Sequence, residues 1–313
     1  MVRNRLLEGW FPSKRRCSGL DQPQHPDYDN ENRKLKETLQ IIRHETHLTA
    51  RQEKEQHEEV ESLRKHSGGI YLPELYVKET IYRHTVQTLR NLRLAKDKPY
   101  FTRVDFQEKS KKDVATYYIG KYGVIHSETQ QPVIIDWRSP VANLYYSGQT
   151  GPSSYDTPEG LVEGELLLKR QFGIRNGKLE TIFDTEVVSQ DLFLQSVLGS
   201  YADHRLKDIV TTIQKEQNDI IRAPREKPLI VQGVAGSGKT TIALHRIAFL
   251  LYTYQDIMAP ENMMILAPNP LFLNYISDVL PDLGVENVVQ TTFYQLTKEL
   301  TDGKLPPLED DKK

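Results

Sequence analysis

The chain has 313 residues, of which 38% are hydrophobic and 27% are charged, and its formal net charge is −2. These values are typical of a soluble globular protein long enough for two domains, and they exclude an overall positive field that would draw the molecule onto nucleic acid. No run of 18 apolar residues is present, so we expect no contact with a membrane. The single cysteine, Cys17, excludes an internal disulfide, and the lack of an apolar signal-peptide segment predicts a cytoplasmic protein.

Two helices are predicted after a short leader. Residues 1–26 mix basic residues with prolines and are interpreted as a disordered basic leader. Residues 32–66 are rich in Glu, Lys, Gln, Arg and His and contain no glycine or proline, which favours one continuous helix. A second helix is expected over 74–95, after a Ser-Gly-Gly break. Together they predict an antiparallel helical hairpin over 27–97.

The predicted seam between the two helices is apolar only at its ends, and spacings of three and four residues define its members. In the first helix these are Leu35, Leu39, Ile42, Thr46, Thr49, Glu53, Gln56, Val60 and Leu63, and in the second they are Leu75, Tyr82, Val86, Leu89 and Leu92. A hairpin with so few apolar contacts should project from the body and be stable mainly where its ends pack.

Residues 98–188 are interpreted as a mostly antiparallel β module, because the hydrophobic pattern there shifts toward a period of two. Strands are expected over 116–124, 132–137, 141–146, 164–174 and 179–183. The sequence Arg-Asn-Gly-Lys at 175–178 predicts a tight hairpin turn. Asp136 follows three apolar residues, as a magnesium-binding aspartate of a nucleotidase does, but we interpret it as a strand-end residue paired with an arginine such as Arg138.

Residues 233–240 contain the pattern Gly-x-x-x-x-Gly-Lys-Thr of a P-loop. Its glycines let the backbone curl around an anion, Lys239 places a positive charge on phosphate groups, and Thr240 offers a hydroxyl to Mg²⁺. A buried strand over 229–231 and a helix over 241–252 are expected on either side of the loop. A glycine-rich turn without a ligand is the alternative interpretation.

The P-loop predicts a nucleotide and Mg²⁺ as cofactors, and no other small-molecule substrate. Lys239 and Thr240 are the predicted catalytic residues, and Thr240 is also the predicted contact to Mg²⁺. The loop residues predicted to bind nucleotide are Gly233, Val234, Ala235, Gly236, Ser237, Gly238, Lys239, Thr240 and Thr241.

Residues 189–223 are expected to be helical. Beyond the P-loop, strands are expected over 263–267 and 288–290 and helices over 271–280 and 293–300. This alternation opens a doubly wound α/β domain. The predicted fold class is therefore α/β, with an incomplete, RecA-like P-loop domain over 189–313 following the helical hairpin and the β module.

The residues around the P-loop resemble a known family. A KEQ helix start, a strand, GVAGSGKT and a helix with LHRIAFLL resemble the Q motif and motif I of the UvrD/Rep group of superfamily 1 helicases. In that family the glutamine reads the adenine edge, and the resemblance assigns this role to Gln217, for which an exposed helix residue is the alternative. The resemblance thus implies that the nucleotide is ATP.

Longer segments resemble the HelD-type members of this group. These segments are YFTRVDF, VIIDWRSPVANLYY, EGELLLKRQFGIRNGKLETIFDTE and TIQKEQNDIIR, within about residues 100–300. HelD-type proteins are UvrD-like ATPases that bind bacterial RNA polymerase and release it from nucleic acid, and their N-terminal hairpin enters the polymerase secondary channel. RNA polymerase is therefore the implied partner. The family hairpin often has a cluster of acids at its tip, whereas the tip here, KHSGGIYLPELYV, has Glu74 alone.

The resemblance implies only weak contact with DNA, which is a possible partner. APNP at 267–270 includes Asn269 but lacks the aromatic and lysine residues with which UvrD-like helicases hold single-stranded DNA. TTFY at 291–294 resembles a later strand-contacting motif and makes Thr292 and Phe293 candidate contacts, while a core position is the alternative for Phe293.

No apolar strand followed by Asp-Glu occurs after the P-loop, although hydrolysis in this class needs such an acid. We therefore expect the chain to be the N-terminal portion of a longer ATPase, which binds nucleotide poorly and hydrolyses none on its own. A non-catalytic RNA polymerase-binding protein with a vestigial P-loop is the alternative. A small-molecule kinase is disfavoured, because no arginine-rich lid follows the loop.

Overall fold

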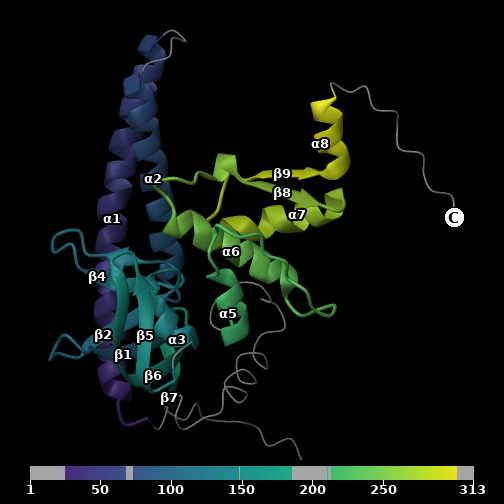
Figure 1. Cartoon of the computed structure of the whole chain (residues 1–313). Coiled ribbons are helices and arrows are strands. Elements are labelled where there is room, and N and C mark those ends of the chain that lie inside the picture. Colours follow the sequence, from purple (N-terminus) through teal and green to yellow (C-terminus); the bar gives the residue numbers. More distant parts are fainter. Residues whose placement is uncertain (1–24, 68–72, 148, 185–209, 211–212, 302–313) are drawn as a thin grey trace, which may run out of the picture.

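The computed structural model describes residues 25–67, 73–147, 149–184, 210 and 213–301 (Figure 1). Most of the expected leader, the tip of the hairpin and most of the helical stretch expected over 189–223 lie outside these residues. In the described part, one half of a long helical hairpin packs along a seven-stranded sheet. A smaller part made of helices and two strands lies beside them. The chain is thus α/β overall, with an N-terminal helical hairpin.

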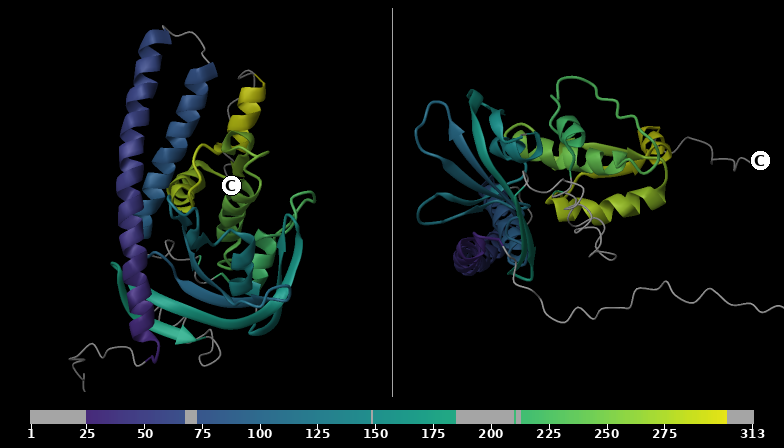
Figure 2. Two further views of the ribbon diagram at one scale, coloured as in Figure 1. Left: turned by 90° about the vertical axis from the view of Figure 1, so that its left-hand side faces the viewer. Right: turned by 90° about the horizontal axis from the view of Figure 1, so that it is seen from below.

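The hairpin, which we call the arm, consists of α1 (Tyr28–Ser67) and α2 (Pro73–Ala95), side by side and antiparallel (Figure 2). Both helices confirm the sequence prediction. At about 1.5 Å per residue, α1 is roughly 60 Å long. The distal half of the arm projects beyond the sheet, as expected of a hairpin packed mainly at its base.

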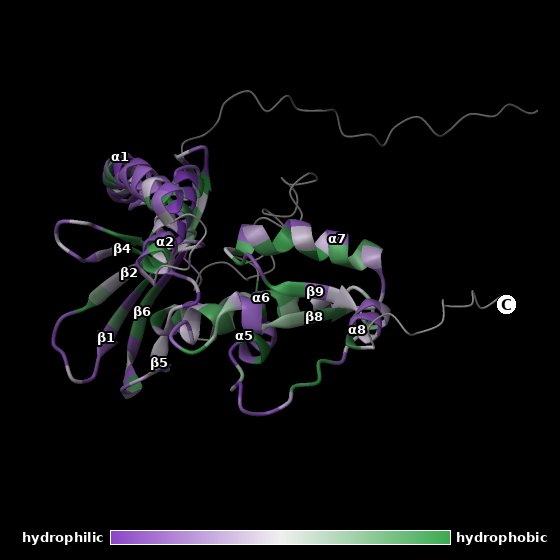
Figure 3. Ribbon diagram, turned by 90° about the horizontal axis from the view of Figure 1, so that it is seen from above, coloured by the Kyte–Doolittle hydropathy of each residue, from purple (hydrophilic) through white to green (hydrophobic). Residues whose placement is uncertain are grey.

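The seam of the arm is apolar at its ends and polar in its middle, as predicted. Ile42 and Val60 of α1 are buried, whereas Glu53 between them is half-buried and accepts a hydrogen bond from Tyr82 of α2. Val86, one helical turn after Tyr82, is 40% exposed. The prediction that Val86 packs in the seam is therefore wrong. Most residues of α1 are hydrophilic (Figure 3). None of the described helices has the apolar length that a bilayer crossing requires.

The sheet of the β module has the order β3-β4-β2-β1-β6-β5, with β7 also paired to β6. Its strands are β1 (Thr102–Glu108), β2 (Ala115–Gly120), β3 (Val124–Ile125), β4 (Pro132–Asp136), β5 (Gly151–Thr157), β6 (Gly160–Arg175) and β7 (Lys178–Asp184). All pairs are antiparallel except β2 with β4, which confirms the mostly antiparallel module. No strand is predicted at β1 or β5, and both pair with the long β6.

The turn between β6 and β7 brings the sheet against the base of the arm. Asn176 and Gly177 have φ of 50° and 70°, the positive values that a two-residue hairpin turn of this kind requires, as the sequence predicts. The Gly177 N–H donates to the carbonyl of Asp97 at 2.9 Å, just after α2. A Cβ at Gly177 would lie 3.2 Å from Leu39 Cδ1, so glycine permits this close approach.

An apolar cluster fixes the base of the arm to the sheet. Its buried members come from α1, α2, the strands and the segments that join them, and they are Leu35, Leu39, Ile42, Leu92, Ala95, Tyr100, Tyr122, Val124, Ile134, Phe172, Ile174, Leu179 and Ile182. Burial of apolar area at about 25 cal/mol per Å² makes this cluster the main stabilising contact of the arm.

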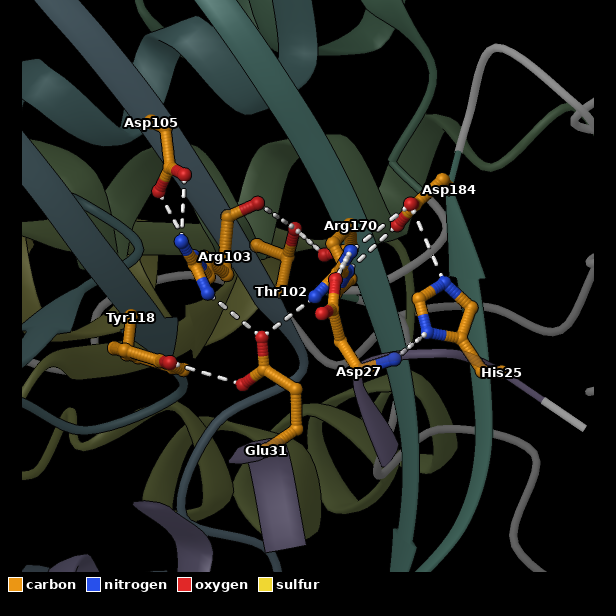
Figure 4. A network of polar contacts seen from close by, with 9 residues as sticks. All are labelled: His25, Asp27, Glu31, Thr102, Arg103, Asp105, Tyr118, Arg170 and Asp184. Carbon is orange, nitrogen blue, oxygen red and sulfur yellow. Dashed lines mark hydrogen bonds and ion pairs between the residues drawn. The ribbon is translucent and has the colours of Figure 1, made fainter. Parts of the chain in front are cut away.

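A network of buried charges lies next to this cluster (Figure 4). Glu31 of α1 is 1% exposed and accepts from Arg103 and Arg170, both at 2.8 Å, and from the Tyr118 hydroxyl at 2.9 Å. Arg170 also binds Asp184 of β7 at 2.6 Å. Burial alone would raise the pKa of Asp184, but its contacts with Arg170 hold that pKa below its usual value.

The segment 141–146, expected as a strand, is helical. Pro140–Ala142 forms a 3₁₀ turn that continues into α3 (Asn143–Ser147). The consecutive residues 144–146 are all buried, whereas a strand with one buried face alternates. Proline suits the first position of such a turn, where its missing N–H has no partner to lose. The strand prediction is therefore wrong here.

The remaining part of the chain alternates helices with a parallel pair of strands. It comprises α5 (Lys215–Ile221), α6 (Lys239–Thr253), β8 (Met264–Ala267), α7 (Pro270–Val279), β9 (Val289–Thr292) and α8 (Phe293–Leu300). β8 pairs with β9 in parallel from Met264 to Ala267, so the two strands end together. The elements from β8 to α8 confirm the alternation predicted after the glycine-rich loop.

Residues 229–231 are not a buried strand. Neither β8 nor β9 pairs with them, and Ile230 is 91% exposed. An apolar run becomes a buried strand only where neighbouring strands supply hydrogen bonds and helices cover both faces. The sheet formed by β8 and β9 has two strands and supplies neither at this segment, so the strand prediction is wrong.

Candidate nucleotide-binding site

An exposed glycine-rich loop lies directly before α6. Gly236 and Gly238 have φ of 81° and 82°, values that favour glycine. A Cβ at Gly233 would lie 2.7 Å from Ser237 Oγ, so a side chain there would require the Ser237 hydroxyl to move. The loop ends where α6 begins at Lys239, and the first N–H groups of a helix attract anions. The backbone therefore has the shape and the donors that a phosphate group needs.

The predicted catalytic residues lie at the start of α6. Lys239 folds back over the loop, and its Nζ donates to the carbonyls of Gly233 at 2.9 Å and Val234 at 2.7 Å. Thr240 and Thr241 are half-buried in the first turn. Val234 is 78% exposed and the neighbouring Ala235 is also exposed, so these two can act through their backbone groups alone.

Gln217 lies beside the loop, although sixteen residues separate it from the first loop glycine. A Cβ at Gly238 would lie 3.4 Å from Gln217 Nε2. The Oε1 atom of the same amide accepts from the Gln214 N–H at 3.2 Å, which orients the side chain at the start of α5. The structure thus brings Gln217 together with the glycine loop.

Arg246 of α6 holds α5 in place. Its Nη1 donates to the carbonyls of Ile220, Ile221 and Ala223 at 3.1, 3.0 and 2.7 Å. These carbonyls lie at the C-terminal end of α5, where a helix leaves acceptors without partners and a cation is favourable. Burial lowers the pKa of Arg246 from its usual value. One arginine therefore joins the helix of Gln217 to the helix that follows the loop.

His245 of α6 contacts the β module. It is 2% exposed, its Nδ1 donates to the Thr241 carbonyl at 2.7 Å, and its ring lies edge-on to Trp137 with 5.5 Å between centroids. Burial lowers the pKa of His245 to about 4, so the ring is neutral at pH 7. Sequence reasoning does not identify His245, Arg246 or Trp137 as functional, and their only signal is that they lie in segments that resemble the family.

The arrangement fits a nucleotide with Mg²⁺. Lys239 and the backbone N–H groups would hold the phosphates, the Thr240 hydroxyl would bind the metal, and the Gln217 amide would contact the base. A bound triphosphate with Mg²⁺ supplies a phosphoanhydride bond that can be cleaved. The positive φ values at Gly236 and Gly238 are the observations that support this fit.

The three predicted nucleic-acid contacts lie near the C-terminal ends of β8 and β9. Asn269 caps α7, and its Oδ1 accepts from the Phe272 N–H at 2.9 Å. Thr292 caps α8, where its Oγ1 accepts from the Gln295 N–H at 3.2 Å. Phe293 is 72% exposed, which excludes a core position within the described residues. A capping role accounts for Asn269 and Thr292, whereas no packing role accounts for Phe293.

Asp136 is paired with an arginine, as the sequence predicts. Arg138 Nε and Nη2 donate to the two carboxylate oxygens at 2.8 and 2.7 Å, and the Arg138 N–H donates at 2.9 Å. Both side chains are mostly buried. The carboxylate is therefore occupied in fixing the turn after β4.

A family model described as the DNA helicase IV HelD N-terminal domain matches residues 28–196. A search of curated proteins gave no match. The matched region begins with α1 and covers the arm and the whole sheet, and it ends before α5 and the glycine loop. Because the match covers more than half of the chain, the chain belongs to the HelD N-terminal domain family and is a helicase-related protein.

Proposed function

We propose that the chain is the ATP-binding N-terminal part of a UvrD-like ATPase of the HelD type, which acts in the cytoplasm. The observation that carries this proposal is the position of Gln217 next to Gly238. A group that can read a base and a loop that can hold phosphates lie together, although α5 and α6 are separate elements. The parallel pair β8 and β9, with α7 and α8 after each strand, supports the start of a RecA-like domain.

The proposed partner is RNA polymerase, which the protein would free from nucleic acid. The projecting arm supports this part of the proposal, because its distal half is long and not packed on the sheet. Family membership supports it as well. DNA contact at Phe293 is a weaker proposal that rests on its exposure.

Titration of the chain with a fluorescent ATP analogue tests nucleotide binding. We expect weak but saturable binding that depends on Mg²⁺, and Lys239→Ala should weaken it further by about tenfold to a hundredfold, the value of a charge-assisted hydrogen bond. Lys298→Ala is the matched control, because Lys298 is exposed on α8, away from the loop. Equal binding by the wild-type chain and Lys239→Ala would overturn the proposal.

A pull-down of purified RNA polymerase tests the second part. We expect the chain to retain polymerase, and a variant that lacks the arm residues 28–95 to retain none. If Lys239→Ala binds polymerase equally well and no nucleotide binds to the wild-type chain, the protein is a non-catalytic polymerase-binding protein. Failure of the wild-type chain to retain polymerase removes the proposed partner.

A further inference from the structure

The helix that carries Gln217 is joined to the β module by buried hydrogen bonds. Asn218, the next residue, is 1% exposed. Its Nδ2 donates to Asn143 Oδ1 at 2.7 Å, and its Oδ1 accepts from Arg222 Nε at 3.0 Å. Asn143 is the first residue of α3, so α5 is tied directly to the module that bears the arm.

Arg222 extends this link to the turn after β4. Its Nη2 donates to the Trp137 carbonyl at 2.7 Å, and its Nη1 donates to the Ser139 carbonyl at 3.3 Å. The guanidinium lies 5.0 Å from the ring centre of Phe249 in α6. Burial lowers the pKa of Arg222 to about 10, which still leaves it charged at neutral pH. Arg222 therefore contacts α5, the β module and α6 together.

The turn whose carbonyls accept from Arg222 is held to the sheet by hydrogen bonds. The Trp137 N–H donates to the Gly120 carbonyl at 3.0 Å, and the Ser139 N–H donates to the Asp136 carbonyl at 3.0 Å. Arg138 holds both oxygens of the Asp136 carboxylate. A side chain that binds this turn is therefore held in a fixed position relative to the β module.

Helix α5 depends on such attachments. It has 7 residues, which is too short to be stable in isolation. The glycine loop does not share this dependence, because it continues directly into the 15-residue α6. Arg246 of α6 holds only the C-terminal end of α5. Loss of the link from the module should therefore move Gln217, which lies in the first turn of α5, while the phosphate-binding residues stay in place.

We propose that Arg222 and Asn218 are positioning residues that set Gln217 against the glycine loop, so that recognition of adenine depends on the module that bears the arm. The inference rests on the proposed nucleotide binding. It assigns a regulatory role to the junction between the turn after β4 and α5. A change in the position of α5 on the module would alter the preference for adenine over other bases and would leave triphosphate binding intact.

The test compares the whole chain with Arg222→Ala and Asn143→Ala, which break the link from opposite ends. Affinities for ATP, GTP and inorganic tripolyphosphate are measured by calorimetric titration with Mg²⁺. We expect the preference for ATP over GTP to fall about tenfold in both variants, which corresponds to the loss of one hydrogen bond. The affinity for tripolyphosphate should change by less than about twofold, because the loop is unaltered.

Arg225→Ala is the control, because Arg225 lies close by in the sequence but stacks on Tyr254 outside the link. This variant should keep the preference for ATP. An unchanged preference in the folded Arg222→Ala and Asn143→Ala chains overturns the inference and leaves the proposed function standing. If Arg222→Ala does not fold, Asn143→Ala alone decides. A wild-type chain that binds no nucleotide overturns the proposed function, and the inference with it.

Discussion

The base of the arm and its distal half belong to the same two helices but are held in opposite ways. At the base, Glu31 is almost inaccessible to solvent and accepts from Arg103 and Arg170. In the distal half, the ion pairs are largely exposed to water, as between Arg64 and Glu79. Charges removed from water must be fully paired, whereas exposed charges keep their hydration with or without a partner.

This difference shows how the same two helices can be rigid at one end and adaptable at the other. The base has one geometry, because the carboxylate of Glu31 is fixed by Arg103, Arg170 and Tyr118. The distal half lacks that constraint, and its side chains can exchange partners at little cost. The arm should therefore transmit force to the sheet at its base while its distal surface adapts to whatever it contacts.

The largest expected effect comes from breaking the charge network at the base. Glu31→Ala leaves the buried Arg170 and the half-buried Arg103 without their shared acceptor, and we expect a loss of about 3–5 kcal/mol in the free energy of unfolding. Urea unfolding followed by circular dichroism measures it. Glu37→Ala, on the exposed side of α1, should change stability by less than about 0.5 kcal/mol. Similar values for both variants would remove the distinction between base and surface.

A smaller loss is expected from the apolar cluster. Ile42 is 1% exposed, so Ile42→Ala should cost about 2–5 kcal/mol through lost burial and a new cavity, toward the lower end if the arm can close on it. Ile81→Ala in the distal half is the matched control, because Ile81 is exposed and should lose less than about 0.5 kcal/mol. The same unfolding experiment compares them, and equal losses would contradict the proposed anchoring at the base.

Acid should weaken the base selectively. The folded-state pKa of Asp184 lies below its unfolded value of about 3.9, so its contribution is complete above that pH and is lost as the pH falls through the folded pKa. Unfolding free energies measured from pH 6 to pH 2 should fall less steeply below pH 4 in Asp184→Asn than in the wild-type chain. Parallel curves would show that Asp184 is not stabilised by Arg170.

The smallest effect is expected in the distal half. Lys78 donates to Glu59 at 2.7 Å, but the pair is exposed to solvent. Lys78→Ala should leave the urea midpoint within experimental scatter, both at low salt and in 1 M NaCl. A clear salt-dependent loss of stability would show that the distal pairs hold the arm together.

The sequence was sufficient for the arm and for the hairpin between β6 and β7. A helix without glycine or proline and an Asn-Gly turn are determined by neighbouring residues, so local patterns predict them. The strand predictions for residues 141–146 and 229–231 are wrong for the opposite reason. The conformation of these two segments depends on what packs against their hydrophobic residues. A short apolar run can become a buried helix, a strand or an exposed segment.

The candidate site divides in the same way. The glycine loop is a local pattern, and the sequence identifies each of its members. The link from Asn143 to Asn218 joins residues that are far apart in the chain, and no spacing rule relates them. Gln217 lies between these cases, since its position next to Gly238 follows from a family resemblance and not from its own neighbours.

The folded-back position of Lys239 has a consequence for which anions the loop accepts. Its ammonium group already serves two backbone carbonyls of the loop. An ammonium group has three N–H donors, and these two carbonyls use two of them. An incoming anion that takes more than the third must replace hydrogen bonds with a net value of about 1 kcal/mol each. A chloride ion or a single carboxylate returns too little to do so, whereas a polyphosphate offers several charged oxygens at once. We therefore expect the loop to bind only anions of high charge density, whatever base is attached to them.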